Sequence, residues 1–233
     1  EQLVIIAQAM GDQPVFCSMT ANSNPDLEGS LGLLHHKLIL AKNCRNFLVA
    51  LQKEQYSNLN LVLPITKSAL ITAQLRKQIS LSGIDRSIGV KIWQTLALPE
   101  NLLQIDKYIE IGFDGVVVDL DRLYSQLTSI SEIERSYYSI NWVFLTELLL
   151  PAFKKLHQEK ITILVSGKLA LFAEVLEFLV HSGVWGVVVP KIEAEGLTEH
   201  LYWAEKKMIK KLHVFSGEEH PYMDKVKSQK SKV

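Results

Sequence analysis

The sequence is poor in cysteine, in net charge and in long apolar runs, and each shortage excludes a class of protein. Cys17 and Cys44 are the only cysteines, and no C-x-x-C pair occurs. A disulfide framework and a zinc-finger pattern are therefore excluded, and a reducing cytoplasm is the expected compartment. Lys plus Arg and Asp plus Glu both number 25, which argues against a nucleic-acid partner. No apolar run reaches the ~18 residues of a membrane span, so no membrane partner is expected.

The size and composition indicate one large domain with a substantial core. The chain has 233 residues, of which 48% are hydrophobic and 21% charged. It starts at Glu1 without a methionine or a signal-peptide pattern, so we expect a fragment of a longer protein. Residues 1–212 are assigned to the domain and residues 213–233 to a polar C-terminal tail.

Short, continuous Val- and Ile-rich runs recur along the chain. Such runs are typical of strands covered on both faces, hence of a parallel sheet. Six are clear, and two further strands are expected near Gly29–Leu33 and in the region before Asn141. The six clear strands are expected at 14–19, 59–65, 88–94, 115–119, 161–166 and 185–190.

Amphipathic stretches of helical length separate these runs. They are expected over 33–54, 68–83, 100–112, 141–160 and 169–183, and three end at Gly83, Gly112 and Gly183, which fit left-handed helix caps. Strands that alternate with helices of this length indicate βαβ units. The predicted fold is therefore a (β/α)8 barrel, whose active sites form at the carboxyl ends of the strands.

Several segments, taken in order, resemble the phosphoenolpyruvate-binding barrel at the C-terminus of phosphoenolpyruvate synthase and pyruvate phosphate dikinase. NPDLEGSLG is similar to the family's NPMLGWRG, LVLPITKSA to its MIPFVRT strand, and GVKIWQTLALPENLLQIDKYI to GVMIEIPSNALLADQF. FDGVVVDLDRLYSQL resembles FDGFSIGSNDLTQL, and ILVSGK and GVVVPK resemble VSICGE and SISVNP. The likeness covers roughly residues 14 to 212.

The resemblance implies transfer of phosphate between a phosphohistidine and pyruvate on Mg²⁺, with nucleotide-binding and phosphohistidine domains upstream in the same chain. It places Ser166 at the catalytic cysteine and, depending on where a two-residue insertion falls, Gln94 or Ala97 at a metal-ligating glutamate. Arg122 falls at the metal-ligating aspartate, so Asp119 and Asp121 are the carboxylates that remain for a metal. The residues implied for the substrate anion are Ser18, Lys67, Lys168 and Lys191.

The substitutions argue against the family's chemistry. A neutral Gln94 is a weaker magnesium ligand than a glutamate, and the hydroxyl of Ser166 is a poorer proton donor than a thiol. The family's arginines on the substrate correspond to Ser18 and Leu31, while Lys67 keeps a positive charge. We therefore expect phosphotransfer to be lost or altered.

Structural explanations compete with several of these assignments. Asp119 and Asp121 follow a strand, where an aspartate commonly caps the next helix. Lys67, Lys168 and Lys191 fit an anion site or solvated loops, and Ser166 with Lys168 has the composition of a Ser–Lys nucleophile pair.

Three functions remain open at this point. The first is a divergent barrel domain of the synthase type that is inactive or altered. The second is an active metal-dependent lyase or transferase on a 2-oxo acid, with a relocated Asp119/Asp121 metal site. The third is a non-catalytic scaffold or dimerisation domain, for which a homodimer is a candidate assembly. Phosphoenolpyruvate, pyruvate or another 2-oxo acid is the ligand expected if a ligand binds.

Overall fold

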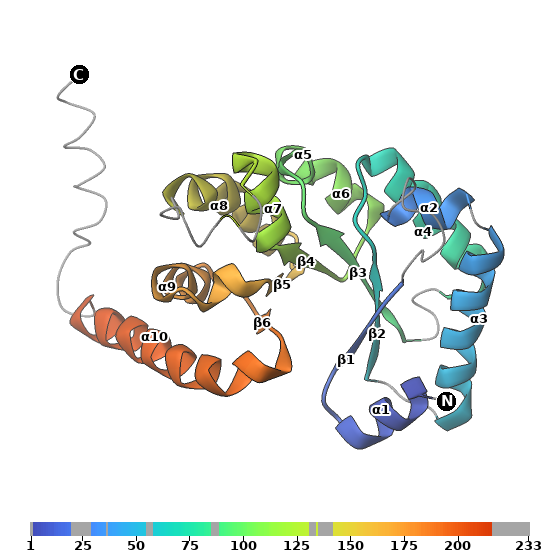
Figure 1. Cartoon of the computed structure of the whole chain (residues 1–233), viewed down its shortest axis with the longest axis horizontal. Coiled ribbons are helices and arrows are strands. Elements are labelled where there is room, and N and C mark those ends of the chain that lie inside the picture. Colours follow the sequence, from blue (N-terminus) through green and yellow to red (C-terminus); the bar gives the residue numbers. More distant parts are fainter. Residues whose placement is uncertain are drawn as a thin grey trace.

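The computed structural model contains one parallel sheet that is curled like part of an open barrel (Figure 1). The structure describes residues 2–19, 29–35, 37–54, 58–84, 89–130, 134 and 142–215. All six clearly predicted strands are confirmed, and they lie in the sheet in the order of the sequence. Their bounds are β1 Val15–Ser18, β2 Leu59–Leu63, β3 Lys91–Leu96, β4 Gly115–Asp119, β5 Thr162–Ser166 and β6 Gly186–Val188.

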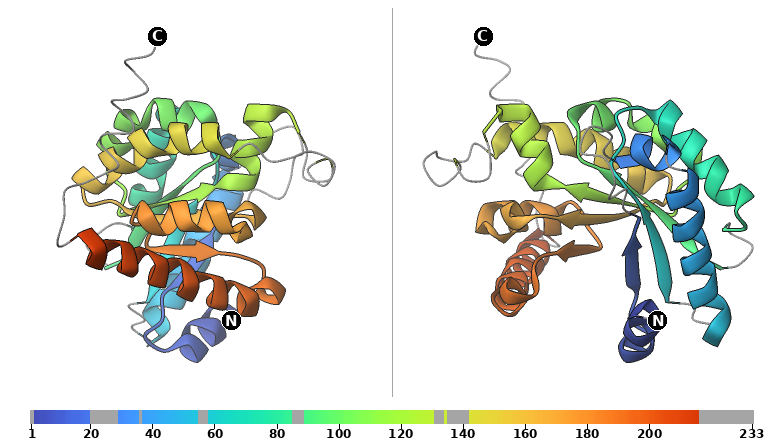
Figure 2. Two further views of the ribbon diagram at one scale, coloured as in Figure 1. Left: turned by 90° about the vertical axis from the view of Figure 1, so that its left-hand side faces the viewer. Right: turned by 45° about the vertical axis from the view of Figure 1, so that its right-hand side comes forward.

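Helices follow the strands and cover the convex face of the sheet (Figure 2). The predicted helices are present, although 33–54, 100–112 and 169–183 are each divided. Gly83, Gly112 and Gly183 all have positive φ angles, as their predicted position after a helix requires. The helices are α1 Gln2–Met10, α2 Gly29–His35, α3 Lys37–Glu54, α4 Ala69–Leu81, α5 Pro99–Leu103, α6 Ile105–Ile111, α7 Leu120–Thr128, α8 Val143–Gln158, α9 Ala173–His181 and α10 Ala194–Phe215, with 3-10 turns η3 Lys168–Leu171 and η4 Lys191–Glu193.

The prediction of a closed eight-stranded barrel was wrong for the described residues. Their sheet has six strands, and β1 and β6 are its two edges. The segment Gly29–Leu33, expected to be a strand, belongs to helix α2. Ser30 explains this placement, since its N–H donates to Ile65 O and its hydroxyl donates to Pro64 O, both just beyond β2. The other expected strand, before Asn141, lies outside the described residues apart from Glu134.

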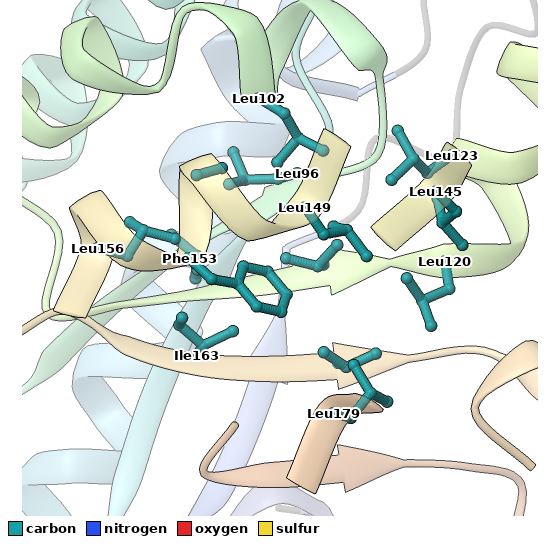
Figure 3. Packing of buried hydrophobic residues seen from close by; sticks show 14 of the residues in the cluster. Leu96, Leu102, Leu120, Leu123, Leu145, Leu149, Phe153, Leu156, Ile163 and Leu179 are labelled. Carbon is teal, nitrogen blue, oxygen red and sulfur yellow. The ribbon is translucent and has the colours of Figure 1, made fainter. Parts of the chain in front are cut away.

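Successive side chains along each strand point alternately to the two faces of the sheet. The convex face meets the helices in two large apolar clusters, one around β1–β3 with α1–α4 and one around β3–β5 with α5–α9. Figure 3 shows the second cluster, in which Phe153 and Leu149 of α8 point toward the strands and Ile163 lies on β5. The length of these apolar runs is thus explained by helices on one face and by packing on the other.

A smaller aromatic cluster fills part of the concave face. The ring of Trp93 lies 4.9 Å from that of Phe16 and 6.4 Å from that of Trp185. Val62 and Leu164 pack with Trp93, whose indole N–H donates to Asn60 Oδ1 at 3.2 Å. Trp93 is buried, whereas Trp185 at the β6 edge is 58% exposed.

Candidate functional site

Asp119 and Ser166 lie side by side where β4 and β5 end. They are partners in the parallel register of these strands, so their side chains point from the same face. That face is the concave one, because Val117 and Leu164, two residues earlier on each strand, pack with the aromatic cluster. Both residues thus end neighbouring strands at one edge of the sheet, which is the edge where a parallel fold can form a site.

Asp119 caps helix α7. Its Oδ1 accepts the backbone N–H of Arg122 at 3.0 Å, and its own backbone is extended. An aspartate at this position satisfies an amide that has no partner inside the helix. Asp119 thus acts as the N-cap of α7, the structural role that competes with metal binding at this position.

Asp121 fastens the loop after β5. Its Oδ2 accepts the N–H of Lys168 at 2.6 Å and its Oδ1 accepts the N–H of Leu169 at 3.1 Å. Gly167 makes the close approach feasible: its φ is +119°, and a Cβ there would lie 2.8 Å from Asp121 Oδ2. Both carboxylate oxygens are therefore engaged by the backbone of a neighbouring strand-end loop, so Asp121 has a structural role.

Gln94 lies on the opposite face of the sheet from Asp119. It shares the convex side with Ile92 and Leu96, which are two residues away on β3 and belong to the helix-packed clusters. Its side chain is fully buried, and Nε2 donates to Pro64 O at 3.0 Å and to Thr95 O at 2.8 Å. Gln94 Oε1 is buried with no hydrogen-bond partner. Gln94 therefore lies behind the sheet rather than at its concave mouth.

The basic residues and Ser18 also lie at strand ends. Ser18 ends β1, Lys67 follows β2, Lys168 begins the turn after β5 and Lys191 follows β6. All four side chains are exposed. Their common edge agrees with the predicted mouth of the barrel.

These residues do not fit a magnesium ion. A magnesium site requires oxygen ligands that converge on one point. Gln94 lies on the opposite face of the sheet from Asp119, and both carboxylate oxygens of Asp121 accept the amides of Lys168 and Leu169. Among the described residues, no three His, Cys, Asp or Glu side chains are grouped closely enough to hold a metal.

Asn101 is a buried polar residue that the sequence analysis did not single out. It links two strand-end loops, because its Nδ2 donates to Thr66 O at 3.1 Å while its Oδ1 accepts from Ala97 N and Leu98 N. Its Nδ2 also donates to the hydroxyl of Tyr108 at 2.7 Å, and burial raises the pKa of Tyr108. The signal for it in the sequence is only an asparagine two residues after Pro99, at the start of α5.

In the part of the chain that the structure describes, no helix combines the length and apolar character of a membrane span. A comparison with known proteins adds no identification: no family model matches the chain, and no curated protein matches it.

Proposed function

We propose that this chain is a divergent domain of the phosphoenolpyruvate synthase and pyruvate phosphate dikinase type that serves as a non-catalytic scaffold. The observation that carries the proposal is the bonding of Asp121, whose two carboxylate oxygens accept the N–H groups of Lys168 and Leu169. A carboxylate held in this way fixes the strand-end loops instead of binding a metal. The sequential parallel sheet and the order of the motifs support the ancestry.

The strand-end residues also lack the groups that phosphotransfer needs. Ser166 stands beside Asp119 in the place that the resemblance assigns to a thiol acid, and a hydroxyl loses its proton far less readily. Gln94 donates to two carbonyl groups on the other side of the sheet. Restoring one group would therefore not restore the family's reaction.

Ligand-dependent stability tests this proposal. The melting temperature of the chain is measured with Mg²⁺ or Mn²⁺ alone, and with oxalate, pyruvate or phosphoenolpyruvate added. We expect no change, because a ligand that does not bind the folded state does not stabilise it. Asp121→Asn is the matched variant. A saturable rise that requires both metal and a 2-oxo acid, and that Asp121→Asn abolishes, would overturn the scaffold function.

That outcome would instead support a metal-dependent lyase or transferase acting on a 2-oxo acid. The observation in its favour is that Asp119 and Ser166 are neighbours on the concave face, with the Asp121 loop next to them. In this second candidate function, Lys67, Lys168 and Lys191 bind the substrate anion.

A further inference from the structure

An apolar cavity lies at the last edge of the sheet, where β6, α9 and α10 are next to one another (Figure 1). Its volume is about 370 Å³. Leu179 of α9 and Val184 line it, together with Leu201 and Met208 of α10. Ligand pockets in proteins have volumes of ~300–1,000 Å³, so a cavity of this size is suited to a small molecule and not to a folded partner.

Two large apolar side chains of this cavity remain exposed. Trp185 is 58% exposed and Ile209 is 53% exposed, and both contribute to the lining. The indole of Trp185 is fixed from behind, because its ring lies 6.3 Å from that of Phe16 and 6.4 Å from that of Trp93. Exposed apolar surface around a cavity is typical of a binding site. Since this surface is held in place, little conformational entropy is lost when a ligand binds.

One carboxylate accompanies the apolar lining. Of the described residues that line the cavity, Glu205 alone is charged. It is four residues from both Leu201 and Ile209, so the three share one face of α10. The side chain of Glu205 is exposed, and no cation among the described residues is paired with it.

The two lysines that follow this carboxylate in sequence are engaged elsewhere. The ammonium group of Lys206 lies 4.9 Å from the ring of Trp203 and 5.4 Å from that of Tyr202. Lys207 forms an ion pair with Glu177 of α9 at 2.5 Å. Neither lysine neutralises the cavity, which therefore combines an apolar bed with one negative charge.

We propose that this cavity binds a small organic ammonium ion, whose apolar part packs on Val184 and Leu201 and whose ammonium group meets Glu205. Burial of apolar surface supplies most of the affinity, and the carboxylate selects the sign of the ligand's charge. Trp185 adds an aromatic surface, to which ammonium ions are attracted. An anion of the same shape would bring like charges together at Glu205 and is disfavoured.

This site goes beyond the proposed scaffold function and lies at a different place in the fold. Trp185 directly precedes β6, so the cavity is near the amino end of that strand, whereas Asp119 and Ser166 are at the carboxyl ends of β4 and β5. Binding of an ammonium ion here would leave the strand-end proposal intact. A response to metal and oxalate at the strand ends would likewise leave this site intact.

Three probes of equal chain length and different charge test the site: hexylammonium, hexan-1-ol and hexanoate. The chain is labelled with ¹⁵N, and the indole N–H resonance of Trp185, assigned with Trp185→Phe, is followed as each probe is added at pH 7 up to about 20 mM. Hexylammonium should shift it saturably with a Kd of about 1 mM, as expected of a ligand with few heavy atoms. Hexan-1-ol should bind about fivefold more weakly, and hexanoate more weakly still.

Two variants separate the charge from the apolar bed. Glu205→Gln should lower the affinity for hexylammonium about fivefold, to that of hexan-1-ol, and should leave hexan-1-ol binding unchanged. Ile209→Asn should weaken both probes alike, by at least about threefold. Glu199→Gln is the matched control, because Glu199 is an exposed acid of α10 outside the cavity, and it should bind all three probes as wild type does.

Three results would overturn the proposal. The first is a Trp185 resonance that shows no saturable shift with hexylammonium. The second is hexanoate binding as tightly as hexylammonium, which would mean that the lysines set the charge of the cavity. The third is a Glu205→Gln variant that keeps the preference for hexylammonium over hexan-1-ol. If wild type binds hexan-1-ol as tightly as hexylammonium, the cavity belongs to a neutral apolar molecule and the assignment to an ammonium ion is wrong.

Discussion

The carboxylate of Asp121 bonds to the backbone of Lys168, which is 47 residues away in sequence, at 2.6 Å. Through this bond the start of α7 holds the loop after β5. Gly167 directly precedes Lys168, and a side chain there would press against the same carboxylate. The carboxylate of Asp121 therefore joins the loops that follow β4 and β5.

Asp121→Ala should lower the free energy of unfolding by about 1 kcal/mol, because it leaves two loop amides without their acceptor. Gly167→Ala should cost about 1–3 kcal/mol, since its φ of +119° strains any residue with a Cβ. In the double variant the contact with the carboxylate is gone, so the total loss should be smaller than the sum by at least about 0.5 kcal/mol.

Urea denaturation of the two single variants and the double variant measures this coupling. Asp106→Ala is the control, because the ion pair of Asp106 with Lys155 is exposed and should contribute less than about 0.5 kcal/mol. Strict additivity of Asp121→Ala and Gly167→Ala would show that the contact carries no energy.

Gln94→Glu should destabilise the fold by about 3 kcal/mol and should not create a response to Mg²⁺. The amide nitrogen of Gln94 donates to Pro64 O and Thr95 O in a fully buried position, and an ionised carboxylate would face both oxygens without a donor. The loss should grow as the pH rises from about 4 to 7, since ionisation removes the last proton that can be donated.

Chemical denaturation at several pH values, with and without Mg²⁺, provides the measurement. Gln94→Met removes the same hydrogen bonds without adding a charge, so its cost should be smaller and independent of pH. A Gln94→Glu variant that is as stable as wild type and gains stability from Mg²⁺ would place this side chain at the mouth instead.

Gly115→Ala should displace the indole of Trp93. These residues are neighbours in the register of β3 and β4, and a Cβ on Gly115 would lie 2.3 Å from the indole ring. Overpacking of this kind costs about 1–3 kcal/mol, and the near-ultraviolet circular dichroism of the aromatic cluster should weaken. Gly196→Ala is the control, because a Cβ there meets nothing within 4 Å. Alanine at this position in α10 should raise the free energy of unfolding by about 0.5–1 kcal/mol. An unchanged aromatic spectrum in Gly115→Ala would contradict the packing described.

The two thiols should react slowly while the chain is folded. Burial raises the pKa of Cys17 to about 11 and also raises the pKa of Cys44. Only the thiolate is nucleophilic, so at pH 8.5 the rate of Cys17 alkylation should fall about a hundredfold below that of the unfolded chain. The folded-state rate should still be rising at pH 10. Iodoacetamide labelling with peptide mapping measures each thiol, and a plateau for Cys17 near pH 9 would contradict the raised pKa.

The strands were predictable because each is marked by a local sequence pattern, a short run of apolar residues. Val- and Ile-rich runs such as 115–119 and 161–166 stay continuous when helices cover one face and packing covers the other. The error at Gly29–Leu33 has a non-local cause, since Ser30 is bound by carbonyl groups that follow β2, and such contacts override short-range propensity.

The candidate site was predictable in position but not in bonding. Asp119 and Ser166 were both expected at strand ends, and a parallel register makes them neighbours. The bond from Asp121 to the loop at Lys168 spans two units of the fold. The outward direction of Gln94 depends on which residues of β3 face the helices. The sequence lists these residues without showing which of them meet.

The sequential strand order gives the domain the pattern of a chain of linked units, in which each strand pairs only with the strands next to it in sequence. Each strand from β2 to β5 is stabilised by pairing with a strand on both sides, whereas β1 and β6 are each paired on one side only. Amide hydrogen exchange should therefore be slowest at β3 and β4 and faster toward both ends, as in repeat arrays that unravel from their termini. The same order allows this sheet to assemble by adding one strand and helix at a time, without inserting a strand between two already paired.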